Sequence, residues 1–463
     1  MSTDQTATTE PGTRARKTAA TRERIVAAAR DVFTGRGYRT ASLRDVASAA
    51  GLSHPGLLKH FATKDRLLAA VIAEFDAATA DALRAEGPPT PVRGLAFARI
   101  AARNETLPGY LPLYAALVGE ASTPGHPAHA SMRERYAHLR RTAATEMGTA
   151  IGTGAVHSAR DLDGEAARIA AAWDGLQLLE LYLPERVQLV PLLTEAQELL
   201  SVAPAWRASA DEAAFGAADA AARAASDAVS DTASGTVSDT VSDAGAASAP
   251  ASGTVAGWPV PDADADEGGT DGYRVGRERR ARIIRDATSL FARDGYTDTS
   301  LREIATRVGL SKSALLHHYP SKEALLRAVL AERDRAVSTT LPTNGIRGAD
   351  LLRELPRRAA IDTDSAPGLV RLYAVLSCEA LTLDHPAHDY FTLRYAAVID
   401  YFAGLLRVAQ RDGDLPAHRD PEREAIRLVA LWDGLQYQWL YDPDSVDVSA
   451  QLAAHLDDIL PPR

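Results

Sequence analysis

Two stretches of the chain combine polar and basic side chains with the spacing of a short helix that could read DNA. They are Ser42–Phe61 and Ser300–Tyr319, which are near-copies of each other. In the second copy, Lys312, Ser313 and His317 stay polar on a helix whose other side is apolar. Ammonium, hydroxyl and imidazole groups can bond to phosphates and to base edges. These residues therefore indicate recognition of double-stranded DNA.

The elements that must position these groups are two short helices joined by a tight turn. Leu301, Ile304 and Val308 lie at helical spacing and give the first helix one apolar face. Gly309 supplies the backbone freedom that ends this helix, and Ser311 can cap the next one. This is the layout of a helix-turn-helix, whose second helix enters the major groove. An ordinary helical hairpin shows the same pattern, so the pattern alone leaves both interpretations open.

A second group of residues has the composition of a metal site. The two sets are Glu120, His126 and His129, and Glu379, His385 and His388. Imidazole and carboxylate groups are suitable ligands for zinc. A proline lies between the two histidines of each set, however, and a role in a turn or at a helix start is the simpler interpretation. We therefore expect no metal.

Enzyme chemistry has no matching pattern in this chain. The sequence contains no glycine-rich phosphate loop, no paired cysteine motif and no Gly-x-Ser-x-Gly elbow. We expect neither catalysis nor a cofactor.

The sequence around both stretches is duplicated as well. The matching features are Arg24-Ile25 and Arg282-Ile283, Phe33 and Phe291, Gly37-Tyr38 and Gly295-Tyr296, and Lys64-x-x-Leu67-Leu68 and Lys322-x-x-Leu325-Leu326. With these features the sequence resembles the TetR family of one-component regulators, whose three-helix DNA-binding domain ends where a lysine opens the fourth helix. Both copies depart from that family at one position, because Leu58 and Leu316 stand where it often has a phosphate-contacting tyrosine.

The resemblance implies DNA contacts in both copies. Roles facing the phosphates fall to Ser42, His60 and Lys64, and to Ser300, His318 and Lys322. The positions that read bases are His54, Pro55, Gly56 and Lys59 in the first copy, and Lys312, Ser313, Ala314 and His317 in the second. Arg44, Ser53, Arg302 and Ser311 complete the expected DNA-binding set. A merely solvated helix face is the alternative, since charged faces are common.

The duplication continues into the C-terminal part of each copy. Trp173–Gln177 recurs as Trp432–Gln436, and Leu181-Tyr182 recurs as Leu440-Tyr441. Packing in the core or at a subunit interface is the favoured role, with direct ligand contact as the alternative. In TetR-like proteins the last two helices of each subunit form the dimer interface, and the middle helices enclose the pocket. The expected pocket residues are Tyr110, Tyr114, Trp173, Gln177, Tyr373, Trp432 and Gln436.

The sequence therefore predicts an all-α protein of two TetR-like subunits in tandem. Each comprises an N-terminal three-helix helix-turn-helix domain and a helical ligand-binding and dimerisation domain. The expected divisions are a disordered basic arm (1–20), the first DNA-binding domain (21–66), the first regulatory domain (67–206), a flexible acidic linker (207–272), the second DNA-binding domain (273–324) and the second regulatory domain (325–463).

Composition agrees with a two-domain or larger chain that acts on DNA. The 463 residues exceed what one hydrophobic core usually holds. The net charge is −10, yet Lys and Arg outnumber Asp and Glu across residues 1–66 and 274–327. Cys378 is the single cysteine, which suits a reducing compartment. Without a secretory or membrane-spanning segment in the sequence, we expect a cytoplasmic protein with no membrane partner.

The function expected from these features is ligand-responsive regulation of transcription, with repression as its mode. The partners would be a double-stranded DNA operator and a small-molecule effector. The two halves are expected to pair within one chain as a pseudo-dimer, and a homodimer of tandem chains is the alternative. A different class of function also remains open, namely a small-molecule-binding or assembly protein in which one reader domain no longer binds DNA.

Overall fold

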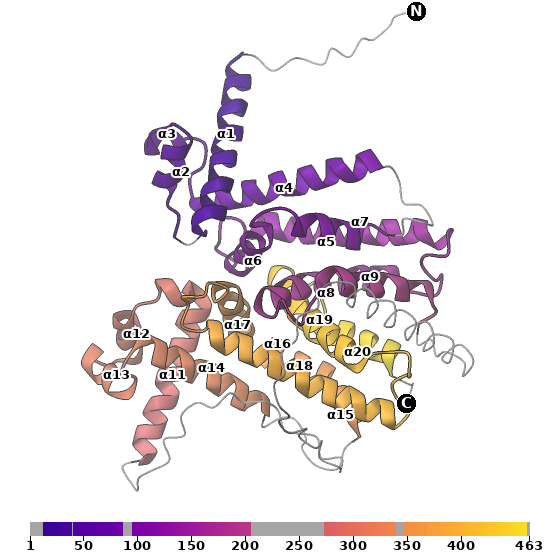
Figure 1. The fold of residues 1–463 in the computed structure, drawn as a ribbon. Helices are drawn as coiled ribbons and strands as arrows, with labels where there is room; N and C mark the ends of the chain where they lie inside the picture. Colours follow the sequence, from indigo (N-terminus) through magenta and orange to yellow (C-terminus); the bar gives the residue numbers. More distant parts are fainter. Residues whose placement is uncertain are drawn as a thin grey trace, which may run out of the picture.

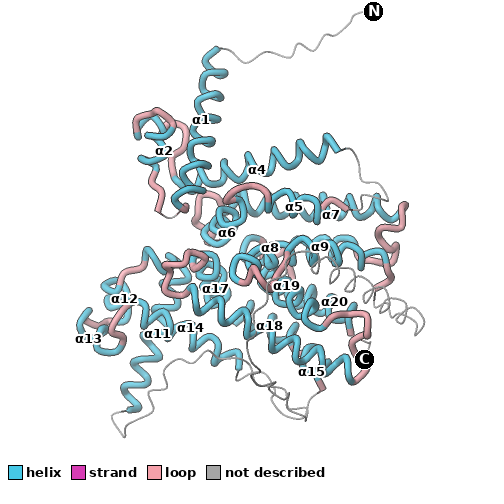
Figure 2. The backbone as a smooth tube through the Cα atoms, in the orientation of Figure 1, coloured by secondary structure: helices cyan, strands magenta, loops and turns pink. Residues whose placement is uncertain are grey.

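The computed structural model describes residues 13–38, 40–86, 95–204, 273–338, 347–365 and 367–460. Within these ranges every regular element is a helix and no strand is present, which confirms the predicted all-α fold (Figure 2). None of the described helices has the length and apolar character needed to cross a bilayer. The predicted linker, 207–272, lies outside the described residues, as do residues 1–12.

The helices of the two halves follow each other in the same order (Figure 1). The first half contains α1 (Thr13–Arg36), α2 (Leu43–Ala49), α3 (His54–Leu58), α4 (Lys64–Glu86), α5 (Phe97–Glu105), α6 (Tyr110–Ala121), α7 (His129–Ile151), α8 (Leu162–Tyr182), α9 (Leu189–Glu198) and the 3₁₀ turn η1 (Leu199–Ser201). The second half contains α11 (Tyr273–Asp298), α12 (Leu301–Val308), α13 (Lys312–His318), α14 (Lys322–Ser338), α15 (Gly348–Leu352), α16 (Leu355–Ser365), α17 (Pro367–Glu379), α18 (His388–Arg411), α19 (Pro421–Tyr441) and α20 (Val448–Ile459).

The prediction of a disordered arm over residues 1–20 is wrong for residues 13–20, because α1 already begins at Thr13. Residues 15–20 are exposed, so packing does not explain this extension. Alanine, arginine and lysine are strong helix formers, and lengthening an existing helix avoids the cost of nucleating a new one. The basic side chains therefore extend the first helix.

Helices α8 and α19 pack against each other at the centre of the molecule (Figure 1). Their backbones approach so closely that a Cβ atom on Gly175 would lie 1.9 Å from the Ala430 carbonyl oxygen. The reciprocal position is equally tight, because a Cβ on Gly434 would lie 1.8 Å from the Ala171 oxygen. The glycine of each repeated Trp-Asp-Gly motif is thus the residue that lets the two halves meet.

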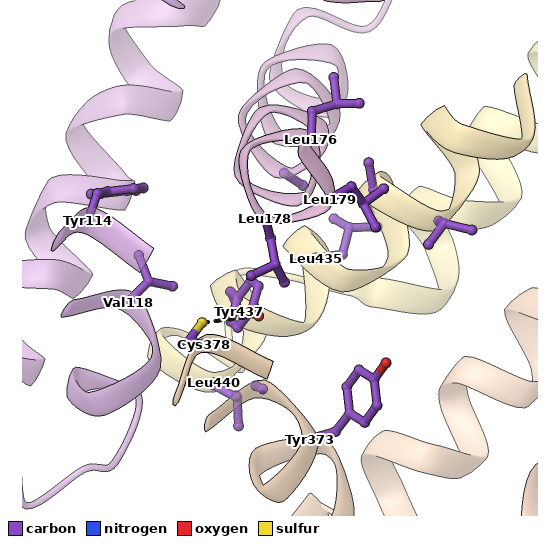
Figure 3. Close-up of a cluster of buried hydrophobic side chains, with 14 of the residues drawn as sticks. Tyr114, Val118, Leu176, Leu178, Leu179, Tyr373, Cys378, Leu435, Tyr437 and Leu440 are labelled. Carbon is purple, nitrogen blue, oxygen red and sulfur yellow. Dashed lines mark hydrogen bonds between the residues drawn. The ribbon is translucent and has the colours of Figure 1, made fainter. Parts of the chain in front are cut away.

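Cys378 lies in a cluster of buried side chains where both halves contribute (Figure 3). Its Sγ is 3.4 Å from the hydroxyl of Tyr437, and a Cβ on Gly119 of α6 would lie 2.5 Å from the Cys378 Cβ. Burial raises the pKa of the Cys378 thiol to about 12, so the thiolate is not formed at neutral pH. This cysteine therefore fills the core.

Candidate nucleic-acid interface and effector pocket

Both reader helices, α3 and α13, begin at a serine that caps them. Ser53 Oγ accepts the Gly56 N–H at 3.2 Å, and Ser311 Oγ accepts the Ala314 N–H at 3.1 Å. Each bond satisfies a backbone donor that the first helical turn leaves unpaired. Ser53 and Ser311, predicted to contact DNA, therefore first hold the start of the helix in place.

The predicted base-reading residues lie on accessible parts of these helices. Pro55, Lys59, Lys312, Ser313 and His317 are exposed, and His54, Gly56 and Ala314 are half-buried. Arg44 on α2 and Arg302 on α12 are exposed as well. Each copy thus presents its polar groups from one short helix-turn-helix.

The serines that start α2 and α12 differ in their bonds. Ser42 Oγ accepts the Asp45 N–H and donates its own proton to the Asp45 carboxylate at 2.6 Å. The hydroxyl and backbone N–H of Ser42 hold the pKa of Asp45 below its usual range. Ser300 Oγ accepts the Glu303 N–H at 3.1 Å. The Ser42 hydroxyl is therefore tied to a carboxylate of its own helix.

The lysine that opens each fourth helix is stacked on a tyrosine. Lys64 Nζ lies 4.3 Å from the centre of the Tyr38 ring, and Lys322 Nζ lies 4.2 Å from that of Tyr296. A ring face attracts a cation and limits the directions in which the lysine can point. Both lysines are half-buried and so are held in a defined place.

Arg22 of α1, which is not among the predicted DNA-binding residues, lies beside the first reader helix. Arg22 donates to the His60 carbonyl at 2.8 Å and lies 4.3 Å over the Phe61 ring. Together with Lys59 and Arg66 it lines a hollow beside the reader helix. In the second half the pKa of His318 is lowered, mainly by burial. His317 and the positive charges of Arg280 and Arg279 lower it further. Arg22 and Arg280 stand at corresponding positions of the two copies, and this repetition could have indicated their place beside the reader helices.

Asp65, Glu120 and His126 meet where the first reader joins the helical core. One ligand atom from each lies within 4.8 Å of the others. His126 Nδ1 accepts the Ala128 N–H at 3.1 Å, so the neutral ring carries its proton on Nε2, which faces Asp65 at 3.7 Å. A metal on Nε2 would need that proton removed. The arrangement fits the predicted turn role and does not fit a metal.

A small pocket in the second half is lined by two of the predicted pocket residues, Trp432 and Gln436. Its other lining residues are Arg333, Asp362, Arg394, Val398, Phe402, Val429 and Asp433. Tyr373 is fully buried behind it, with the Arg333 guanidinium 4.0 Å above its ring. Trp432 Nε1 is buried and has no hydrogen-bond partner among the described residues.

Two of the predicted pocket residues of the first half, Tyr110 and Tyr114, lie in a buried polar cluster. Tyr110 and Tyr114 stack with their ring centres 5.8 Å apart. Asp174 accepts the hydroxyls of Tyr114 and Tyr136 at 3.0 and 2.7 Å. Burial nevertheless raises the pKa of Asp174 to about 6. Trp173 Nε1 also lacks a partner within the part of the chain that the structure describes.

Asp174 and its counterpart Asp433 are residues that the sequence analysis did not select. Asp433 accepts the Tyr395 hydroxyl at 2.9 Å, and burial raises its pKa too. A carboxylate inside a repeated apolar helix was the signal, because a buried charge must find partners.

Comparison with known families agrees with this geometry. The pattern described as "Bacterial regulatory proteins, tetR family" matches residues 25–71 and again residues 283–329. The chain belongs to the TetR family. A second pattern, "BetI-type transcriptional repressor, C-terminal", matches residues 378–461. The two N-terminal matches confirm the predicted tandem of TetR-like subunits.

Individual TetR proteins match one half of the chain at a time. The transcriptional regulator TtgR of Pseudomonas putida is 28% identical over 188 residues, which is 39% of this chain and 89% of that protein. UidR of Escherichia coli K12 is 25% identical over 37% of this chain and 85% of its own length. The solved structure of GusR from Salmonella enterica is 26% identical, covers 41% of this chain and 99% of that one, and has a TM-score of 0.34.

Proposed function

We propose that this TetR-family protein is a ligand-responsive repressor that binds one operator with two different reader domains from one chain. The presence of two complete, serine-capped helix-turn-helix units carries the proposal. Each has exposed polar groups and a lysine held on a tyrosine ring. Binding and release of DNA need no catalytic step, so the proposal contains none.

Packing of the two halves supports an intramolecular pseudo-dimer. Helix α8 lies against α19, and α6 against α17. Apolar side chains from both halves fill this region (Figure 3). Because both halves belong to one chain, each has an effective concentration near the other that approaches about the millimolar range. Pairing within the chain would then exceed pairing with a second chain at ordinary concentrations.

The buried indole N–H groups support an effector site among the middle helices. An unpaired buried donor is costly, and a small molecule with a hydrogen-bond acceptor would satisfy Trp432 Nε1. The pocket beside it has both apolar and charged walls. A ligand releases DNA only if it binds one arrangement of the readers better than the other.

The test has two stages. DNA fragments bound by the purified chain are first recovered by genomic footprinting, and their affinity is measured by fluorescence anisotropy. A library of small molecules is then screened for thermal stabilisation and for DNA release, with Trp432→Phe as the variant that removes the indole N–H. The proposal expects a stabilising ligand that weakens DNA binding in the natural protein more than in the variant. Recovery of no specific fragment would contradict it.

A further inference from the structure

We infer that charges on the surface between the halves allow unlike halves to pair and exclude like ones. This inference rests on the proposed pairing within the chain and adds a rule for the choice of partner. A constant spacing of 259 residues relates the two regulatory domains, as between Trp173 and Trp432. For each contact between the halves, this spacing shows which residues would meet there if two identical halves paired instead.

The first contact joins two arginines of α7 to a buried carboxylate at the end of α19. Arg133 and Arg140 approach Asp442 at 3.0 and 3.3 Å. Asp442 is only 4% exposed, so its charge depends on these partners. The corresponding positions carry no charge. They are Thr392 for Arg133, Ile399 for Arg140 and Leu183 for Asp442.

In the second contact, as in the first, the first half provides the arginine and the second half provides the carboxylates. Arg186, just beyond α8, approaches Asp400 at 2.6 Å and Glu422 at 2.7 Å. Its own counterpart is Ser445, and the counterpart of Asp400 is a basic residue, Arg141. Glu422 corresponds to another acidic residue, Asp163, so only the bond to Asp400 is specific to unlike halves.

In a third contact the first half provides the carboxylate and the second half provides the arginines. Glu195 of α9 forms ion pairs with Arg423 and Arg427 of α19, at 2.5 and 2.6 Å. The residue that corresponds to Glu195 in the second half is Ala454. Arg423 corresponds to Gly164, whereas Arg427 corresponds to another arginine, Arg168. Each of the three contacts therefore includes at least one ion pair between a residue that only the first half has and one that only the second half has.

Pairs of identical halves would lose most of these contacts. Two first halves would place Arg140 against Leu183, and Arg186 near Arg141 as well as Asp163. Two second halves would bury Asp442 against Ile399 without a cation. A buried charge that loses its partner is strongly unfavourable, and like charges repel. The apolar centre cannot make this distinction, because Gly175 and Gly434 belong to the same repeated motif.

The test uses the intact chain with a specific protease site placed in the segment 207–272. After cleavage, protein with natural isotopes is mixed with uniformly ¹⁵N-labelled protein, and native mass spectrometry follows the exchange of halves. The inference expects labelled and unlabelled halves to exchange only into pairs of one first and one second half. Like pairs as abundant as unlike ones would overturn it, and so would dissociation into single halves.

A variant tests whether the charges are responsible. Arg133→Thr, Arg140→Ile, Arg186→Ser and Asp442→Leu together give each position the residue of its counterpart. Like pairs should then appear after exchange. The control is Arg84→Ile, at an exposed arginine of α4 that pairs with Asp81 of the same helix, and it should leave the natural pairing unchanged. Continued absence of like pairs in the four-residue variant would overturn the inference. Operator binding by the uncut chain is measured separately, so that failure of the pairing rule and failure of the proposed function can be told apart.

Discussion

The hydroxyl of Tyr441 donates a hydrogen bond to the backbone carbonyl of Val118 in the other half, across 2.6 Å. Tyr182 makes the reciprocal bond to the Ser377 carbonyl across 2.5 Å. One repeated Leu-Tyr motif thus ties the end of α8 to α17 and the end of α19 to α6. Any rearrangement of α6 must therefore either break a contact with the other half or carry that contact with it.

Removing one of these hydroxyls should weaken the pairing of the halves. Tyr441→Phe leaves the ring in place and removes only the bond to Val118, so the free energy of unfolding should fall by about 1 kcal/mol. Tyr182→Phe is the matched variant and should show the same loss. Urea unfolding followed by circular dichroism measures both. Equal stability of the natural protein and both variants would show that the reciprocal bonds contribute nothing.

The close approach of α8 and α19 leaves no room for a larger residue at its centre. Gly175→Ala places a methyl group 1.9 Å from the Ala430 oxygen, and the strain should lower the free energy of unfolding by at least about 1–3 kcal/mol. Gly404 on α18 has nothing within 4 Å of its Cβ position. Gly404→Ala is therefore the control and should be neutral or stabilising. A stable Gly175→Ala protein would mean that the helices are farther apart in solution.

Local pattern was enough to predict much of the fold and of the reader domains. The fourth helix begins at Lys64, the lysine expected to open it, and Ser311 caps α13 as the turn sequence predicts. These features depend on neighbouring residues, so a single sequence contains the information.

Contacts between distant residues could not be predicted in this way. Arg140 and Asp442 lie in different halves, and neither is repeated in the other copy, so duplication gave no signal for their bond. Tyr110 and Tyr114 have the composition of a pocket wall, yet they are buried in the core. Composition does not tell which aromatic side chains face a cavity, because that depends on how the helices pack.

Both readers should contact phosphates through their stacked lysines. Lys322→Ala and Lys64→Ala should each weaken binding to all DNA sequences alike and lower the slope of log affinity against log salt by about one unit. Anisotropy titrations at several salt concentrations measure the slope. Arg407→Ala on α18, where the arginine pairs with Glu422, is the control and should leave the slope unchanged. If one lysine variant behaves like the control, that half is not a reader, and the assembly function becomes the better description.

The buried carboxylate of Asp174 should give stability a defined dependence on pH. Its folded pKa of about 6 is above the ordinary value of 3.8, so the native state holds this proton more tightly than the unfolded chain does. The stabilisation is complete below about pH 4 and is lost as pH rises through 6. Asp174→Asn should remove this loss, so the variant should gain stability relative to the natural protein between pH 4 and pH 7. Burial lowers the pKa of His455 to about 4, so the contribution of this group to stability increases as pH rises. His455 is present in both proteins, so its contribution cancels when their stabilities are subtracted.

The operator should consist of two unlike half-sites, because the residues that read bases differ between the copies. The first reader presents His54, Pro55 and Lys59, whereas the second presents Lys312 and Ser313. A base contact discriminates one base from another by about 1–3 kcal/mol, whereas a phosphate contact does not discriminate. Lys312→Ala should therefore relax sequence preference in one half-site and leave the other unchanged, and Lys59→Ala should do the reverse. Selection of bound sequences from a random DNA pool measures both preferences at once. A perfectly palindromic selected site, or loss of preference in both half-sites from a single change, would contradict two independent readers in one chain.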